Sequence, residues 1–155
     1  MKIELPDEVD ILLVDGNPPE VELTLRALTG LGDVPRVGVA RDGEEALDYL
    51  LGRGRFRHRQ GAPLPRLILL ELKLPRVDGP EVLRAVRSSH RTSTVPIVVL
   101  TSSTEPRVLA QCYQLGANSC VQKPIEFQPF CDTLQALGRY WLGINQPPPT
   151  MVQAV

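Results

Sequence analysis

Short apolar segments and amphipathic segments alternate five times along this chain of 155 residues. The apolar segments are rich in Val, Ile and Leu, and the segments between them repeat apolar residues at the spacing of an α-helix. The expected strands are 9–14, 36–40, 66–71, 95–101 and 118–123, and the expected helices are 20–32, 43–52, 79–89, 105–116 and 126–143. Such an alternation is typical of an α/β protein in which a doubly wound, five-stranded parallel sheet carries five helices on its two faces.

The length of the chain fits a single domain. We expect this domain to cover residues 1–143 and the Pro-rich segment 144–155 to form a flexible C-terminal tail. No apolar stretch reaches the ~18 residues that a membrane helix needs, and the first residues lack the apolar core of a signal peptide. Three Cys without metal-binding spacing suit a reducing compartment, so we expect a cytoplasmic protein with no membrane contact.

Four of the expected strands end at a polar side chain. Asp15, Glu71, Thr101 and Lys123 stand at the carboxyl ends of the first, third, fourth and fifth strands. Open parallel sheets bind ligands outside the carboxyl ends of their strands, so we expect these four side chains to converge at one edge. A charge at the end of a buried strand is costly unless it has a partner or a task, and Glu71 therefore needs an explanation.

Residues 9–143 resemble the receiver domains of response regulators, the bacterial proteins of two-component signalling. The resemblance rests on the segments ILLVDGNPPEVELTLRAL, LILLELKLPRVDGPEVL, VPIVVLTSS and QKP. It implies the flavodoxin-like receiver fold. The segment YLLGRGRFRHRQGAPLPRL before the third strand and the YWL at the end of the last helix are similar to the phytochrome-associated single-domain regulators.

Members of this family receive a phosphoryl group from a histidine kinase on an aspartate that ends the third strand. The resemblance implies that Asp15 is one of two acids that hold Mg²⁺, that Thr101 turns toward the phosphoryl group, and that Lys123 pairs with its charge. It also implies that the peptide bond between Lys123 and Pro124 is cis. All four of these residues match the family pattern.

Three positions depart from that pattern. Glu71 takes the place of the phosphoacceptor aspartate, Gly16 replaces the second metal-binding acid, and Cys120 stands where the family has a switch aromatic. Asp15, Glu71 and the backbone carbonyl of Lys73 then remain as protein ligands. Because Mg²⁺ demands a rigid octahedron of oxygens, we expect its binding to be weak or absent and no cofactor to be required.

The departures also act on phosphoryl transfer. A glutamate is one methylene longer than an aspartate, and a displacement of about 1 Å can cost ~10²-fold in rate. Loss of the metal affects the same step. The missing acid at position 16 removes a negative charge and lessens the need for a divalent cation, so Glu71 and Lys123 are expected to pair without metal. Glu71 then acts as a partial phosphoryl mimic near Thr101.

We therefore expect an atypical single-domain response regulator that acts by protein–protein interaction, independently of phosphorylation. Its expected partner is a signalling protein such as a histidine kinase of the phytochrome type. The resemblance implies a homodimer through the fourth helix, the fifth strand and the fifth helix. The alternative is a conventional phosphorelay regulator that a histidine kinase phosphorylates slowly and with weak Mg²⁺ dependence.

Other classes of function fit the sequence less well. A phosphatase with an aspartate nucleophile needs the acid that Gly16 replaces, so we expect that the chain is not an enzyme. A nucleotide-binding module needs a Gly-rich loop after the first strand, and the segment DGNPPE at that place lacks one. The net charge of −1 indicates no nucleic-acid partner. The four arginines of residues 53–59 leave phosphate contacts as an alternative to a solvated or partner-facing loop pinned by Phe56. A redox sensor is the alternative to small core thiols for the three Cys.

Overall fold

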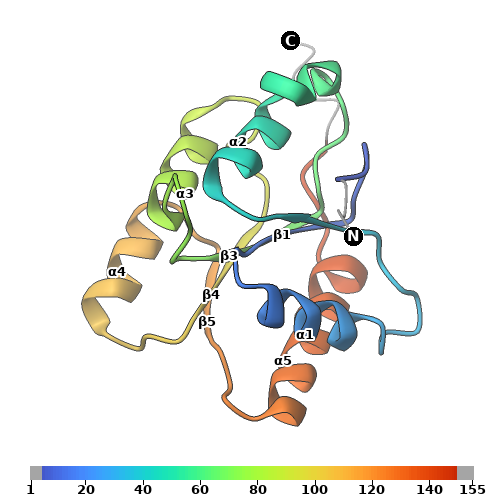
Figure 1. The fold of residues 1–155 in the computed structure, drawn as a ribbon, viewed down its shortest axis with the longest axis vertical. Helices are drawn as coiled ribbons and strands as arrows, with labels where there is room; N and C mark the ends of the chain where they lie inside the picture. Colours follow the sequence, from blue (N-terminus) through green and yellow to red (C-terminus); the bar gives the residue numbers. More distant parts are fainter. Residues whose placement is uncertain (1–4, 150–155) are drawn as a thin grey trace.

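The computed structural model describes residues 5–149, in which five parallel strands form one sheet with the order β2-β1-β3-β4-β5 (Figure 1). The strands are β1 (Ile11–Val14), β2 (Val37–Ala40), β3 (Leu67–Glu71), β4 (Ile97–Thr101) and β5 (Ser119–Gln122). The main helices are α1 (Pro18–Leu28), α2 (Gly43–Leu51), α3 (Gly79–Ser88), α4 (Pro106–Gln114) and α5 (Phe127–Arg139). A 3-10 helix, η1 (Gly54–Arg59), follows α2, and a π-helical turn, η2 (Tyr140–Ile144), follows α5. The predicted doubly wound α/β fold is confirmed.

The sheet has two apolar faces because successive strand residues point to opposite sides. In β1, Leu12 and Val14 face the helices α2, α3 and α4, whereas Ile11 and Leu13 face α1 and α5 (Figure 1). All four side chains are buried. Burial of each such side chain stabilises the fold by roughly 1.5–3 kcal/mol, which explains why β1 is apolar at every position instead of alternating with polar residues.

The strand register determines where the polar strand ends lie. Val14 pairs with Leu70 across β1 and β3, and Thr101 pairs with Gln122 across β4 and β5. These partners are level with one another, so the residues that end or directly follow the strands lie along the same edge of the sheet. This is the edge at which parallel sheets bind their ligands.

Helix boundaries differ from the expected ones where local chemistry starts or ends a helix. The first helix begins at Pro18 instead of residue 20, because the side chain of Asn17 caps it and proline is harmless in a first turn. The expected helix 126–143 is divided, since α5 ends at Arg139 and the π-helical turn follows. Within residues 5–149, no helix is both long and apolar enough to cross a lipid bilayer.

The chain after α5 turns back along the domain. The guanidinium of Arg66 donates to the carbonyl of Leu142 at 2.5 Å, which ties η2 to the start of β3. Ile144, where we expected the flexible tail to begin, is still part of η2. Residues 150–155 of that tail and residues 1–4 of the expected domain lie outside the described residues, so the boundary between domain and tail stays a prediction.

The arginine-rich segment 53–59 packs against the domain around η1. Phe56 is buried, as expected, and Arg59 is only 1% exposed. The Arg59 guanidinium donates to the carbonyls of Asp7, Tyr49 and Pro63, and it lies 3.6 Å from the centre of the Tyr49 ring. Arg53 and Arg55 pair with carboxylates of α2. Three of the four arginines thus bind within the chain, which favours a structural role over the phosphate-binding alternative.

Candidate functional site

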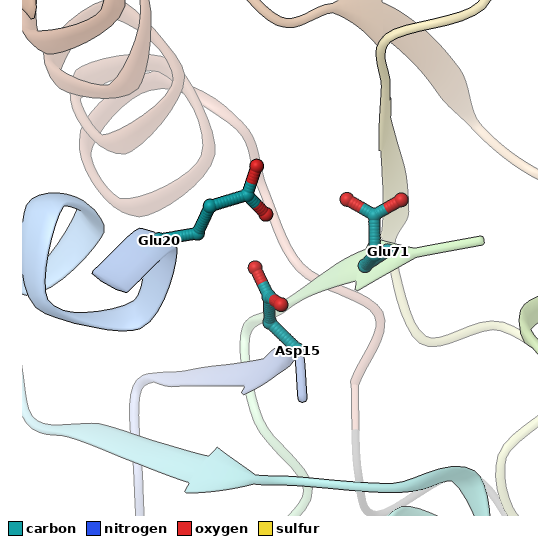
Figure 2. A group of neighbouring side chains, drawn as sticks. All are labelled: Asp15, Glu20 and Glu71. Carbon is teal, nitrogen blue, oxygen red and sulfur yellow. The ribbon is translucent and has the colours of Figure 1, made fainter. Parts of the chain in front are cut away.

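Asp15, Glu71 and Lys123 meet at the carboxyl edge of the sheet. Asp15 follows β1, Glu71 ends β3, and Lys123 follows β5. Figure 2 shows that a third carboxylate, that of Glu20 from α1, lies beside the carboxylates of Asp15 and Glu71. Oxygens of these three carboxylates lie within 4.8 Å of one another. The structure thus brings together three of the four strand-end groups and adds an acid that the sequence reasoning did not include.

Glu71 is bound through both of its carboxylate oxygens. Oε2 forms an ion pair with the ammonium of Lys123, and Oε1 accepts hydrogen bonds from the backbone N–H groups of Leu72 at 3.0 Å and Lys73 at 3.5 Å. The side chain is 13% exposed. The charge at the end of the apolar strand β3 is therefore satisfied by a partly buried cation and by the backbone N–H groups of the two residues that follow.

Lys123 is bound by two carboxylates. Its Nζ donates to Glu71 and, at 2.7 Å, to Oε2 of Glu20, and the lysine side chain is 11% exposed. Burial by itself would lower the pKa of Lys123, but the hydrogen bonds and negative charges of Glu20 and Glu71 outweigh burial, and the pKa is raised. The lysine is therefore a fixed positive charge at neutral pH.

Glu20 is the site residue that the sequence reasoning missed. It lies in the first turn of α1, and its partner Lys123 is 103 residues away in the sequence. The usable signal was its distance from Asp15, because a residue in the first turn of a helix that follows β1 directly stays near the strand edge. Glu20 adds a carboxylate to the pocket from α1, and the expected loss of one negative charge at position 16 stays a prediction.

Asp15 is buried, with 4% of its surface exposed. Its Oδ1 accepts a hydrogen bond from the backbone N–H of Asn17 at 2.9 Å. Burial raises the pKa of Asp15 to about 6, the Asn17 hydrogen bond and the charge of Lys123 oppose this rise, and the nearby carboxylates add to it. Asp15 is the carboxylate of the pocket whose ionisation is disfavoured by its surroundings.

Gly16 lies where neighbouring backbone leaves no room for a side chain. A Cβ at this position would be 2.7 Å from the carbonyl oxygen of Arg41 and 3.0 Å from Cδ of Pro75. Both groups belong to loops at the same edge of the sheet, after β2 and β3. The glycine at position 16 therefore lets the loops after β2 and β3 pack closely at this edge, in addition to removing a metal ligand.

Thr101 and Cys120 bond to neighbours outside the carboxylate cluster. The hydroxyl of Thr101 accepts from the N–H of Ser103 at 3.0 Å, so it is turned into the loop before α4, and no hydrogen bond joins it to Glu71. Within residues 5–149, Thr101 thus has no hydrogen bond to Glu71, and the expected place of Glu71 near Thr101 as a phosphoryl mimic stays a prediction. The N–H of Cys120 donates to the hydroxyl of Tyr113 at 3.2 Å, and burial raises the pKa of the Cys120 thiol to about 11.

Two other expected features lie at the rim. The peptide bond between Lys123 and Pro124 is trans, contrary to the expectation from the family, and trans is the isomer that X–Pro bonds ordinarily favour. Lys73 is exposed and lines an open groove of about 970 Å³ beside the carboxylates, together with residues 16–19, 74–75 and Asp78. The Lys73 backbone carbonyl stays a predicted metal ligand.

The carboxylates of Asp15, Glu20 and Glu71 have the oxygen chemistry that Mg²⁺ and similar cations prefer. In this arrangement, however, Lys123 binds one oxygen of Glu20 and one of Glu71, and the second oxygen of Glu71 accepts from backbone. Asp15 is the remaining carboxylate that could bind a divalent cation, and burial disfavours its ionised form. The site as it stands therefore fits an ammonium better than a divalent cation.

Comparison with known proteins decides the family. The model of the response regulator receiver domain matches residues 11–135, which is most of the chain. The chain belongs to this family. The match confirms the resemblance drawn from the sequence segments, and it spans every residue of the pocket.

Individual relatives agree with this assignment. A probable methanogenesis regulatory protein, FilR2 of Methanothrix harundinacea (strain 6Ac), is 41% identical over 146 residues, which are 94% of this chain and 92% of FilR2. The crystal structure of the phosphorylated cyanobacterial phytochrome response regulator RcpA is 31% identical with a TM-score of 0.83, over 90% of this chain and 97% of RcpA. The bacteriophytochrome response regulator AtBRR is 46% identical with a TM-score of 0.70, over 91% of this chain and 100% of AtBRR.

Proposed function

We propose that this chain is an atypical response regulator that signals through protein–protein contacts without a cycle of phosphorylation. The observation that carries the proposal is the partly buried ion pair between Glu71 and Lys123, in a pocket whose position 16 has no acid. The lysine is bound directly to the residue in the phosphoacceptor position. Glu71 carries the same single negative charge as the aspartate of the family and places it one methylene further from the backbone, toward the position of a phosphoryl group.

The bonding of Glu71 also disfavours phosphoryl transfer to it. An attacking carboxylate oxygen must lie in line with the leaving group, and a cation must neutralise the charge that develops. Oε2 of Glu71 is held by Lys123, and Oε1 faces the backbone N–H of Leu72 at 3.0 Å. The attacking oxygen would have to leave one of these partners, and the extra methylene of glutamate displaces it further.

The names of two relatives support a class of partner. RcpA is named as a phytochrome response regulator and AtBRR as a bacteriophytochrome response regulator. We therefore propose a signalling protein, with a phytochrome-type histidine kinase as the first candidate, as the partner of this chain in the cytoplasm. The proposal includes no enzymatic reaction, no required cofactor, and no contact with nucleic acid or membrane.

A homodimer through α4, β5 and α5 is part of the proposal. Three large side chains on α4 or directly after α5 are strongly exposed: Tyr113 by 52%, Tyr140 by 45% and Ile144 by 67%. Exposed aromatic and aliphatic side chains of this size are typical of contact surfaces when they gather on one face. Their exposure is the observation that supports self-association through α4 and the end of α5.

The second candidate is a conventional phosphorelay regulator that is phosphorylated slowly on Glu71 with weak Mg²⁺ dependence. Two observations favour it. Thr101 and Lys123 are present at the matching strand ends, and the relative RcpA has been crystallised in a phosphorylated form. The two candidates differ in one chemical outcome, which is whether an acyl phosphate forms on this chain.

Incubation with acetyl phosphate and Mg²⁺, followed by intact-mass measurement, separates the two candidates. The Glu71→Asp variant restores the shorter acceptor, and the Glu71→Gln variant has no acceptor and serves as the control. We expect no phosphoryl adduct on the native chain or on Glu71→Gln, and a slow gain on Glu71→Asp. A hydroxylamine-sensitive adduct on the native chain that Glu71→Gln lacks would establish the conventional candidate and contradict the proposal.

A further inference from the structure

Lys123 is held from two sides by residues of different elements. Glu71 reaches it from the end of β3, and Glu20 reaches it from the first turn of α1, with 2.7 Å between Glu20 Oε2 and Lys123 Nζ. An ammonium offers three N–H donors and no acceptor, so two of its donors are used by these two carboxylates. The cation is thereby fixed among the carboxylates instead of extending into solvent.

Glu20 occupies a position that is well suited to hold a cation there. Its backbone N–H donates to the capping side chain of Asn17 at 3.3 Å, which anchors the residue at the start of α1. A carboxylate in the first turn is also stabilised by the partial positive charge of the helix N-terminus. The Glu20 side chain is 37% exposed, so it forms the solvent-facing wall of the Lys123 site.

Glu20 brings a carboxylate into the pocket from α1 and not from the loop that holds Gly16. The carbonyl of Arg41 and the ring of Pro75 fill the space in which a side chain of residue 16 would begin. A carboxylate can enter the pocket from α1, where that obstruction does not apply. The Glu20 carboxylate thus reaches Lys123 from the side of α1.

We propose that the Lys123 ammonium is the resident cation of this pocket and that Glu20 is the positioning residue that retains it there. The inference rests on the proposed function, in which the pocket works without a metal ion. A divalent cation must compete with an internal ammonium for Glu20 and Glu71. Removal of the Glu20 charge weakens the retention of Lys123, and removal of the Lys123 charge frees the carboxylates of Glu20 and Glu71 for a metal.

Acylation of the lysines by N-acetoxysuccinimide in EDTA tests the role of Glu20. The chain has three lysines, and cleavage after arginine separates Lys123 in the peptide 108–139 from the exposed Lys73 in the peptide 67–76. The ratio of the acylation rates of Lys123 and Lys73 is measured in the native chain, in Glu20→Gln and in Glu22→Gln. Glu22 lies on the same helix, is 74% exposed and pairs with Arg26, so it is the matched control.

We expect Glu20→Gln to raise the Lys123 to Lys73 ratio by about fivefold or more, because an ammonium held by two carboxylates reacts less than one held by a single carboxylate. Glu22→Gln is expected to leave the ratio unchanged. An equal ratio in native chain and Glu20→Gln would overturn the role of Glu20. As a second measurement, Lys123→Met is expected to bind Mn²⁺ about tenfold more tightly than the native chain, since Glu20 and Glu71 lose the ammonium that competes with a metal for them. Equal Mn²⁺ affinities would overturn the resident-cation proposal.

The outcomes remain separate from those of the phosphorylation assay. A phosphoryl adduct on the native chain, together with a raised acylation ratio in Glu20→Gln, would contradict the proposed function and leave the role of Glu20 intact. No adduct, together with an unchanged ratio, would overturn the role of Glu20 alone.

Discussion

Glu71 and Lys123 lie 52 residues apart in the sequence and form an ion pair in which their side chains are 13% and 11% exposed. A pair with this little exposure loses much of its hydration. Without Glu71, Lys123 has Glu20 as its remaining carboxylate partner, and without Lys123, Glu71 has only backbone N–H groups. The pair therefore favours a single arrangement of the site. In that arrangement, Lys123 is bound to Glu71, the residue in the phosphoacceptor position, and no phosphoryl group is needed to hold it there.

Position 16 is predicted to tolerate no side chain. Gly16→Ala and Gly16→Asp are expected to lower the free energy of unfolding by about 1–3 kcal/mol, because Cβ would meet the Arg41 carbonyl at 2.7 Å. Urea unfolding measures the change. Gly32→Ala is the control, since a Cβ there meets nothing within 4 Å. A Gly16→Ala variant as stable as Gly32→Ala would show that the loop of Arg41 yields freely.

The buried carboxyl of Asp15 is predicted to make stability depend on pH. Its pKa is raised from 3.8 to about 6, chiefly by burial, so the folded chain binds a proton more tightly than the unfolded chain between these values. The contribution of this proton is present in full below pH 4 and is lost as the pH rises through 6. In EDTA, the native chain should lose on the order of 2 kcal/mol relative to Asp15→Asn between pH 4 and pH 7.

Urea unfolding of both proteins across this pH range checks the prediction for Asp15. In the Asp15→Asn variant, the amide oxygen of the new side chain can still accept the hydrogen bond from the backbone N–H of Asn17, so the comparison isolates the charge. A constant difference in stability between the two proteins from pH 4 to pH 7 would mean that the Asp15 carboxyl titrates alike in the folded and unfolded chains.

The strands and helices were predictable because their apolar patterns are local. A run such as residues 67–70 is apolar at every position, which fits a strand covered on both faces, and α1 to α5 repeat apolar residues at helical spacing. The alignment of strand ends follows from the parallel sheet, so the meeting of Asp15, Glu71 and Lys123 could be anticipated. The fold thus follows from periodicity and chain order.

The features that the sequence did not predict depend on contacts between distant segments. Glu20 resembles an ordinary first-turn acid until Lys123 is seen 2.7 Å away. The reason for Gly16 is a backbone carbonyl from the loop after β2, which no pattern at position 16 reveals. Arg59 lies within a run of arginines, and only the fold shows that it is the buried one.

Arg59 is predicted to stabilise the fold instead of serving a ligand. Arg59→Met is expected to lower the free energy of unfolding by about 3 kcal/mol, because it leaves the carbonyls of Asp7, Tyr49 and Pro63 without their donor. Thermal and urea unfolding measure the loss. Arg57→Met is the matched control because Arg57 is exposed in the same segment, and it should change stability by less than about 0.5 kcal/mol. Equal effects of the two substitutions would contradict the role given to Arg59.

A double-mutant cycle between Glu71 and Lys123 in EDTA tests the metal-free ion pair most directly. Free energies of unfolding are measured for the native chain, Glu71→Gln, Lys123→Met and the double variant, without phosphodonor. We predict a coupling free energy of about 2 kcal/mol, because the attraction between Glu71 and Lys123 is lost in either single variant and the double variant loses it only once. Glu20 remains beside position 123 in all four proteins, so its effect on Lys123 does not enter the coupling between Glu71 and Lys123. A coupling of zero within error would show that Glu71 and Lys123 do not stabilise each other without metal, and it would contradict the proposed closed site.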